Sequence, residues 1–188
     1  MMKTEPYQTI EYKDCKIFIH IDSDPLNPRE DENLGKMLCR HSRYDLGDEH
    51  KADREEVLDI LEGRRKDVVA LPLYLYDHSG ITMNTTGFSC PWDSGMVGCI
   101  FATYEKIKEC YGVKRITKNI IEKVKDSLRS EVKVYDAYIQ GNVYGYVIKK
   151  DDEEIEDSCW GYYDEADAIN DAKSVVDNVC KKELTFCK

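Results

Sequence analysis

The chain has 188 residues and a formal net charge of −10, with 41% hydrophobic and 34% charged residues. Its length fits one domain that buries a core, and its hydrophobic and aromatic content excludes an intrinsically disordered chain. The acidic excess argues against a general nucleic-acid binder, because phosphate contacts need clustered cations.

The sequence shows neither a membrane span nor an export signal. No apolar run approaches the roughly 18 residues that a span needs, and the N-terminal stretch MMKTEPYQTIEYKD lacks the apolar segment of a signal peptide. We therefore expect a soluble, cytoplasmic protein. The eight cysteines include no C-x-x-C pair, so we expect free thiols, no zinc motif and no cofactor.

The first predicted element is a strand over Cys15–Ile21, where apolar and polar residues alternate. A long charged loop, residues 22–50, follows it and contains Asp24-Pro25 and Asn27-Pro28. A short helix is expected from Asp53 to Leu61, with Gly63 at its C-terminal cap.

Strands are predicted next in the segments VVALPLYLY, Ile81–Thr85 and MVGCIFAT, with Pro72 favouring an edge or a bulge in the first. Thr103 and Thr117 are expected to cap two helices, the first of which ends near Gly112.

The C-terminal region, residues 131–182, is predicted to form a meander followed by a helix. The predicted strands are EVKVYDAYI, VYGYVIKK and EIEDSCWGYY. Gln140-Gly141-Asn142 is predicted to form the first hairpin turn. Asp164 caps the final helix. Because the strands are joined by hairpins and do not alternate strictly with helices, the sequence predicts an α+β fold. We expect a mainly antiparallel sheet with helices packed on one face, in a single compact domain over residues 1–188.

Asp77, His78 and Ser79 lie next to one another, as the members of a catalytic triad seldom do. Adjacent residues on a turn point in different directions, and the Gly-x-Ser-x-Gly elbow of a nucleophile is absent. We interpret the segment as a turn in which Asp77 and Ser79 bond the backbone and Gly80 supplies a positive φ.

A metal site is the enzymatic alternative. Asp22 and Asp24 follow a strand at a spacing that projects two carboxylates to one side, although Asp before Pro25 is also typical of a turn. If the loops converged, the cluster would consist of Asp22, Asp24, His41, Asp77, His78 and Asp93.

Two tryptophans and a set of tyrosines are candidate contact residues. Trp92, in the turn-rich segment SCPWDSG, is a binding residue if exposed and a plug for the loop if buried, and we expect the plug for both Trp92 and Trp160. The C-terminal tyrosines are expected to pack between a sheet and a helix, namely Tyr135, Tyr138, Tyr144, Tyr146, Tyr162 and Tyr163.

Charge is unevenly distributed along the chain. Ten acidic residues and one Lys lie in Lys150–Asp171, whereas nine basic and four acidic residues lie in Lys106–Lys133. An acidic face could compete for the cations that hold nucleic acid in a partner protein. The candidate partner-binding residues are Trp92, Asp151, Asp152, Glu153, Glu154, Glu156 and Asp157.

Four segments in order resemble a family of small proteins of bacteriophages and other mobile elements of Firmicutes. They are NPREDENLGKMLCRHSRYDLGD, LPLYLYDHSGITMNTTGFSCPWDSGMVGCIF, VYGYVI and DSCWGYY. The chain is also similar in size and charge to anti-CRISPR proteins that act on Cas9-type nucleases. This resemblance implies a host-cell cytoplasmic location and brings no catalytic residue with it.

The resemblance therefore implies a phage-encoded inhibitor of a host defence nuclease such as a Cas9-type effector, which we expect to act without enzymatic activity, by protein binding through an acidic face. The alternative is a metal-dependent hydrolase or nucleotide-processing enzyme built on the six-residue cluster. A third possibility is direct nucleic-acid binding through the basic helices at residues 106–133.

Overall fold

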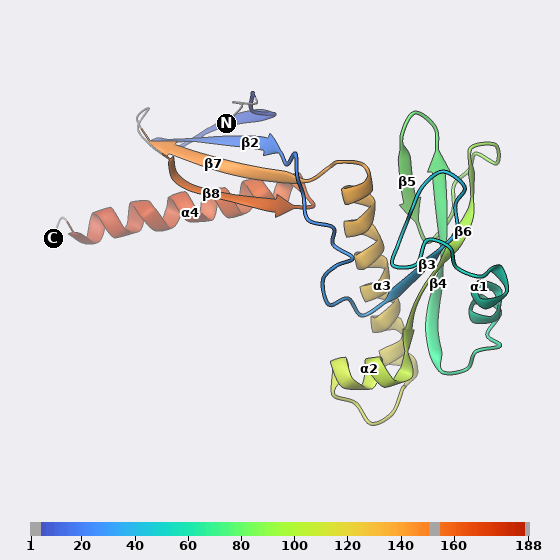
Figure 1. Cartoon of the computed structure of the whole chain (residues 1–188). Helices are drawn as coiled ribbons and strands as arrows, with labels where there is room; N and C mark the ends of the chain where they lie inside the picture. Colours follow the sequence, from blue (N-terminus) through green and yellow to red (C-terminus); the bar gives the residue numbers. More distant parts are fainter. Residues whose placement is uncertain (1–4, 151–154, 187–188) are drawn as a thin grey trace. The chain divides into compact units, whose positions relative to one another are not determined.

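The computed structural model describes residues 5–150 and 155–186. The helices and strands follow one another as β1 (Gln8–Tyr12), β2 (Cys15–Ile21), β3 (Lys36–Cys39), α1 (Arg54–Leu61), β4 (Val68–Asp77), β5 (Ile81–Asn84), β6 (Ser94–Thr103), α2 (Tyr104–Tyr111), α3 (Lys118–Ile139), β7 (Tyr144–Lys150), β8 (Ile155–Tyr162) and α4 (Glu165–Phe186) (Figure 1). The strands form two four-stranded antiparallel sheets, which confirms the predicted α+β class. In the described part of the chain, no helix has the length and apolar composition needed to cross a bilayer.

The chain divides into two compact units, where the sequence analysis expects one domain over residues 1–188. The first unit consists of Met1–Leu26 and Gly141–Lys188, and the second of Asn27–Gln140. The chain leaves the first sheet after β2 and returns to it at β7, which pairs with β2 along its length. The segment between them builds its own sheet and core.

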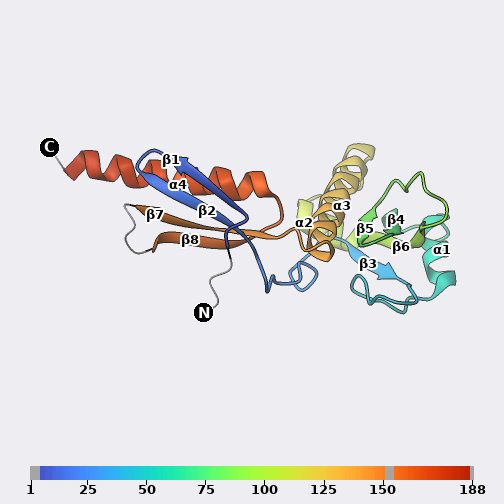
Figure 2. The ribbon, with the colours of Figure 1, turned by 90° about the horizontal axis from the view of Figure 1, so that it is seen from above.

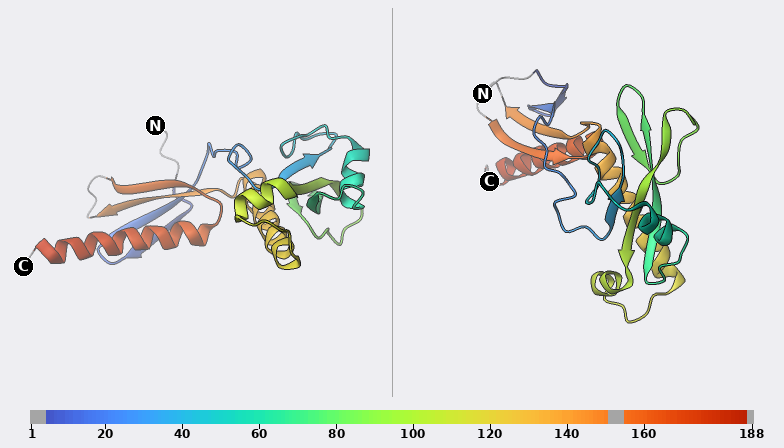
Figure 3. Two further views of the ribbon diagram at one scale, coloured as in Figure 1. Left: turned by 90° about the horizontal axis from the view of Figure 1, so that it is seen from below. Right: turned by 45° about the vertical axis from the view of Figure 1, so that its right-hand side comes forward.

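In the first unit the strand order is β1-β2-β7-β8, and α4 runs along one face (Figure 3). Alternation along the two central strands directs Ile17, Ile19, Tyr146 and Ile148 toward α4, where they form the core with Ala172 and Val176 of the helix. The prediction for Cys15–Ile21 and the Asp164 cap are confirmed, since the Ala166 N–H donates to Asp164 Oδ1 at 3.0 Å.

In the second unit the order is β3-β6-β4-β5, with α3 on one face of the sheet and α1 on the other (Figure 2). The α3 side is filled by Val124, Leu128, Val132 and Tyr135, at the three- and four-residue spacing of one helix face. The three strands predicted in this unit are confirmed as β4, β5 and β6. Pro72 lies in the part of β4 that does not pair with β5, close to a register shift between Leu73 and Tyr74. This position suits proline, which has no N–H to donate to a neighbouring strand.

The predicted helix starts and ends are largely confirmed. The side chains of Asp53, Thr103 and Thr117 accept from backbone N–H groups at the N-termini of α1, α2 and α3. Gly112, with φ of 62°, caps α2.

Three expectations are wrong. The segment EVKVYDAYI is the last part of α3 and not a strand, because Val132 and Tyr135 continue the helical stripe of Val124 and Leu128 onto the sheet. Gly141, with φ of 72°, therefore follows a helix C-terminus and not a hairpin. The loop at residues 22–50 also contains β3, which pairs with β6.

Candidate functional site

The predicted acidic face falls mostly outside the described residues. This applies to Asp151, Asp152, Glu153 and Glu154 and to the side chain of Glu156. Asp157 is exposed on β8 and its carboxylate accepts from the Ser158 N–H at 2.7 Å. The acidic face stays a prediction.

The charge difference between the two units supports an acidic surface on the first. The first unit has nine Lys and seventeen Asp or Glu, a net charge of −8, whereas the second has 18 basic and 20 acidic residues, a net charge of −2. About four-fifths of the net charge is therefore concentrated in the unit that contains the predicted acidic face.

The four members of the alternative metal cluster that lie in the second unit, namely His41, Asp77, His78 and Asp93, do not form a metal-binding group. Within residues 5–150 and 155–186, no group of three or more His, Cys, Asp or Glu side chains is arranged to hold a metal ion. Asp22 instead begins a turn by accepting from the Asp24 N–H at 3.1 Å, the alternative that Pro25 favours. His41 stacks on the Tyr44 ring, with centroids 5.0 Å apart.

The other members of that cluster are occupied in ordinary loop contacts. Asp77 forms an ion pair with Arg43 and accepts from the Tyr44 hydroxyl at 3.3 Å. His78 Nδ1 lies 3.3 Å from Asp93 Oδ2. Asp77-His78-Ser79 does form a turn, in which the His78 N–H donates to the Gly80 carbonyl at 3.0 Å, but its left-handed residue is Ser79, with φ of 58°, where Gly80 was expected. The Asp77 carboxylate, however, binds Arg43 and not the turn backbone.

Trp92 is 90% exposed and Trp160 is 47% exposed, so the expectation that both are buried plugs is wrong. The Trp92 loop is held by its own polar groups: Ser94 Oγ donates to the Cys90 carbonyl, and the Asp77 N–H donates to the Asp93 carbonyl at 2.8 Å. Because these bonds close the loop, the indole is not needed inside it.

The surface around the Trp92 loop is hollowed and has a mixed polar and apolar lining. A hollow of about 650 Å³ beside it is lined by Tyr74, Thr86, Gly87, Phe88, Ser89, Pro91, Ser94, Gly95 and Met96. The Met96 side chain is itself 47% exposed. Trp92 and Met96 are therefore two exposed apolar side chains beside one hollow, and Trp92 stays a candidate contact residue.

Trp160 lies on the face of the first sheet opposite α4. Its indole covers Gly145, where an added Cβ would come within 2.2 Å of the ring, and its ring centroid is 5.9 Å from that of His20. Packing against a glycine explains how a strand tryptophan keeps a half-exposed ring without burial under a helix.

Tyrosines connect the first sheet to α4, as expected for Tyr146 and Tyr162. Their hydroxyls donate to Asp171 Oδ2 at 2.9 and 2.6 Å. Burial, together with the bond to Asp171, raises the pKa of Tyr146 to about 12. Tyr135 and Tyr138 belong to α3 instead, with their ring centroids 6.1 Å apart. None of these contacts provides an open stacking platform.

A partly buried ion cluster in the second unit was not anticipated from the sequence. The side chain of Arg29 is only 4% exposed and donates to Asp48 from Nε and Nη2 at 2.9 and 2.8 Å, to Glu131 at 3.0 Å and to the Gly35 carbonyl at 2.6 Å. Burial opposes its charge, but the hydrogen bonds and charges of Asp48 and Glu131 prevail and raise the Arg29 pKa.

The same carboxylates also satisfy the backbone. Glu131 Oε1 accepts from the Leu34 N–H at 2.8 Å, and Asp48 Oδ2 accepts from the Met37 N–H at 2.7 Å. The cluster therefore pins the loop before β3 to α3, and every charge in it has a partner.

The basic helices are partly neutralised by their own carboxylates. Lys125 pairs with Glu122 at 3.0 Å and Arg129 pairs with Asp126 at 2.7 Å, both one turn apart on α3. Lys106 donates to the Asn33 carbonyl. Direct nucleic-acid binding by this region stays a prediction.

No family model, no curated protein and no solved structure matches the chain. The functional argument therefore depends on the surfaces described above.

Proposed function

We propose that the protein is a non-enzymatic binding protein that uses the Trp92 loop as a contact surface for a partner protein. The observation that carries this proposal is the 90% exposure of Trp92 beside a hollow that combines the aromatic rings of Tyr74 and Phe88 with hydroxyl side chains. Trp is among the residues that contribute most to protein interfaces, and Met96, 47% exposed, adds a second exposed apolar side chain beside the same hollow.

The partner that fits the charge distribution is a nuclease of a host defence system, such as a Cas9-type effector, in the cytoplasm of the host cell. Such a nuclease holds nucleic acid in positively charged channels. The first unit, with a net charge of −8, is a suitable competitor for those cations. The resemblance to phage and anti-CRISPR proteins points to the same class of partner.

The Trp92 surface is tested by Trp92→Ala in a DNA-cleavage assay with purified Cas9-type nuclease. We expect at least about tenfold more protein for half-maximal inhibition, the scale of an interface hot spot. Leu26→Ala is the control, because Leu26 is an apolar side chain at 82% exposure in a different segment. Inhibition that is equally sensitive to both substitutions, or to neither, would contradict the role of Trp92.

The acidic contribution is tested by replacing Asp151, Asp152, Glu153 and Glu154 with Lys. We expect weaker inhibition and a weaker dependence on salt, since screened charge attraction is removed. The control reverses four exposed carboxylates of α2 and α3, namely Glu105, Glu109, Glu122 and Asp126, for the same change in net charge. An equal loss in both variants would show that net charge alone matters. A wild-type protein that inhibits no Cas9-type nuclease would refute this choice of partner.

A further inference from the structure

We propose that a second site, a basic hollow in the second unit, binds the polyphosphate group of a nucleotide-sized ligand. The basic hollow has a volume of about 720 Å³ and is lined by Arg40, His41, Ser42, His50, Lys51 and Arg54. Its lining contains no carboxylate, in a chain with 37 acidic and 27 basic residues. This hollow shares no lining residue with the hollow beside Trp92.

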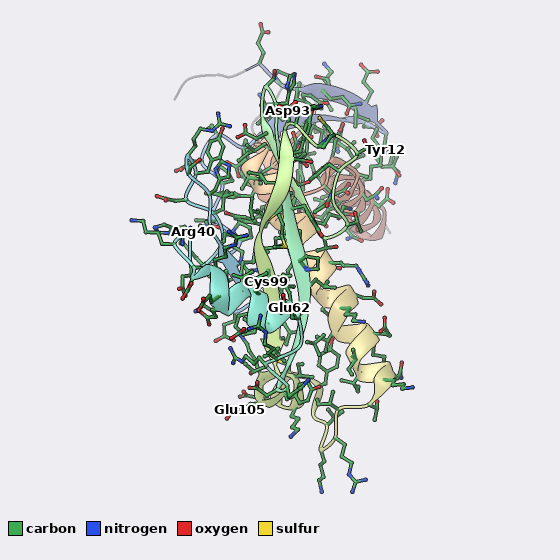
Figure 4. The ribbon with its side chains drawn as sticks, turned by 90° about the vertical axis from the view of Figure 1, so that its right-hand side faces the viewer. Tyr12, Arg40, Glu62, Asp93, Cys99 and Glu105 are labelled. Carbon is green, nitrogen blue, oxygen red and sulfur yellow. The ribbon has the colours of Figure 1, made fainter. Side chains whose placement is uncertain are left out.

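The backbone holds the three cations in place. Arg40 and Lys51 face each other across an antiparallel bridge, and the Ala52 N–H donates to the Cys39 carbonyl at 3.1 Å. Ala52 is completely buried, and Arg54 is the first residue of α1. Figure 4 shows Arg40 at the surface beside the start of α1, away from Asp93 at the end of the sheet. The cationic side chains therefore project from ordered segments.

Nothing in the described residues neutralises these cations. Arg40, Lys51 and Arg54 make no ion pair there, whereas Arg29, Arg43, Arg64 and Arg65 each have a carboxylate partner. Like charges placed opposite one another across a bridge are destabilising. An anion from outside the chain would relieve this repulsion.

The neighbouring carboxylates leave the hollow positive. Asp53 uses its side chain to accept from the Glu55 N–H at 3.0 Å. Asp45 lies 3.6 Å from His50, but its side chain is 82% exposed and is not part of the lining. The basic hollow thus presents three positive charges, two imidazoles and the Ser42 hydroxyl as donors.

These donors fit a compact polyphosphate. Arg binds phosphate oxygens in pairs, and the volume lies within the range of small-ligand sites. A nucleic-acid strand needs a continuous track of cations, but acidic residues interrupt the lining segments in the sequence. Asp45, Asp48 and Glu49 lie between Ser42 and His50, and Glu55 and Glu56 follow Arg54. A nucleoside di- or triphosphate is therefore favoured over a strand.

The test is a calorimetric titration of the full chain at low salt with tripolyphosphate, with ATP and with a short oligothymidylate. We expect one molecule of tripolyphosphate or ATP per chain. The triple variant Arg40→Gln, Lys51→Gln, Arg54→Gln should bind at least about tenfold more weakly.

The matched control is Lys108→Gln, Lys114→Gln, Lys123→Gln, which removes the same charge from exposed positions elsewhere in the second unit. It should change affinity by less than about twofold if binding is local. Circular dichroism verifies that each variant is folded, and the single substitution Lys51→Gln replaces the triple variant if that one is not. No saturable binding of tripolyphosphate or ATP, an equal loss in both variants, or binding of the oligothymidylate alone would overturn the proposal.

Discussion

Two cationic sites lie near β3 in the second unit: Arg29 on one side, and the cations of the basic hollow, which begin at Arg40, on the other. They differ in whether a carboxylate neutralises them. Arg29, before β3, is buried and bonded to two carboxylates, while Arg40, directly after β3, is exposed and unpaired within the described residues. The charge of Arg29 stabilises the fold, because both of its carboxylate partners belong to the same unit. The second site leaves its charge available to a ligand, so a change at each place should affect a different property.

The largest expected effect is on folding, from Arg29→Gln. The substitution leaves Asp48 and Glu131, whose side chains are 21% and 15% exposed, without their counter-ion. Breaking a fully buried pair costs about 3–5 kcal/mol, so we expect a loss near the lower end of that range, about 3 kcal/mol. Urea denaturation followed by far-ultraviolet circular dichroism should show this loss in the free energy of unfolding. A loss below about 1 kcal/mol would show that Arg29 behaves like an exposed ion pair.

A smaller effect on stability is expected at alkaline pH, from two thiols in the sheet of the second unit. Burial raises the pKa of Cys39 and of Cys99 from 9.0 to about 12. The unfolded chain releases these protons above pH 9 while the folded chain retains them to about pH 12, so stability falls as pH rises between these values. At about pH 10 the two thiols together should reduce the free energy of unfolding by about 1–3 kcal/mol.

The matched measurement compares the urea midpoint at pH 8 and pH 10 for the wild type and for Cys39→Ala, Cys99→Ala. The variant starts less stable because the substitutions leave cavities, but its stability should depend less on pH. An unchanged pH dependence would contradict the assignment to these thiols.

The smallest expected effect on stability is at the basic hollow. Arg40→Gln with Lys51→Gln should change the free energy of unfolding by no more than about 0.5 kcal/mol, in the stabilising direction, because a repulsion across the bridge is removed and no ion pair is lost. The same urea denaturation measures this change. A loss near that of Arg29→Gln would mean that these cations also serve the fold.

The contrast between these two cation groups also shows where sequence reasoning succeeds. Local patterns predicted β2, β4, β5, β6 and the capped starts of the helices, because alternation and capping chemistry involve residues close in the chain. The pairing of Arg29 with Glu131 joins residues 102 positions apart, and no local pattern encodes it. The strand predicted at residues 131–139 is wrong for the same reason. Its apolar residues fit a strand and a helix equally well, and the contacts with the distant sheet favour the helix.

For the candidate site, the sequence selected Trp92 but misjudged its exposure, because the segment SCPWDSG does not reveal that its own hydrogen bonds close the loop. The alternative metal cluster contained suitable residue types, but the Asp77 carboxylate forms an ion pair with Arg43. The sequence does not indicate this pairing. The basic hollow was missed because its cations are interspersed with acidic residues in the sequence, and only the bridge between Arg40 and Lys51 brings them together.

The most direct test of this distinction between neutralised and available cations is a residue-resolved nuclear magnetic resonance titration of the labelled protein with tripolyphosphate. We predict saturable shifts of the amide signals of Arg40, His41 and Ser42 and of residues 50–54, with the signals of Arg29, Asp48 and Glu131 unchanged. Shifts confined to residues 106–133, or no saturable shifts at all, would contradict the account.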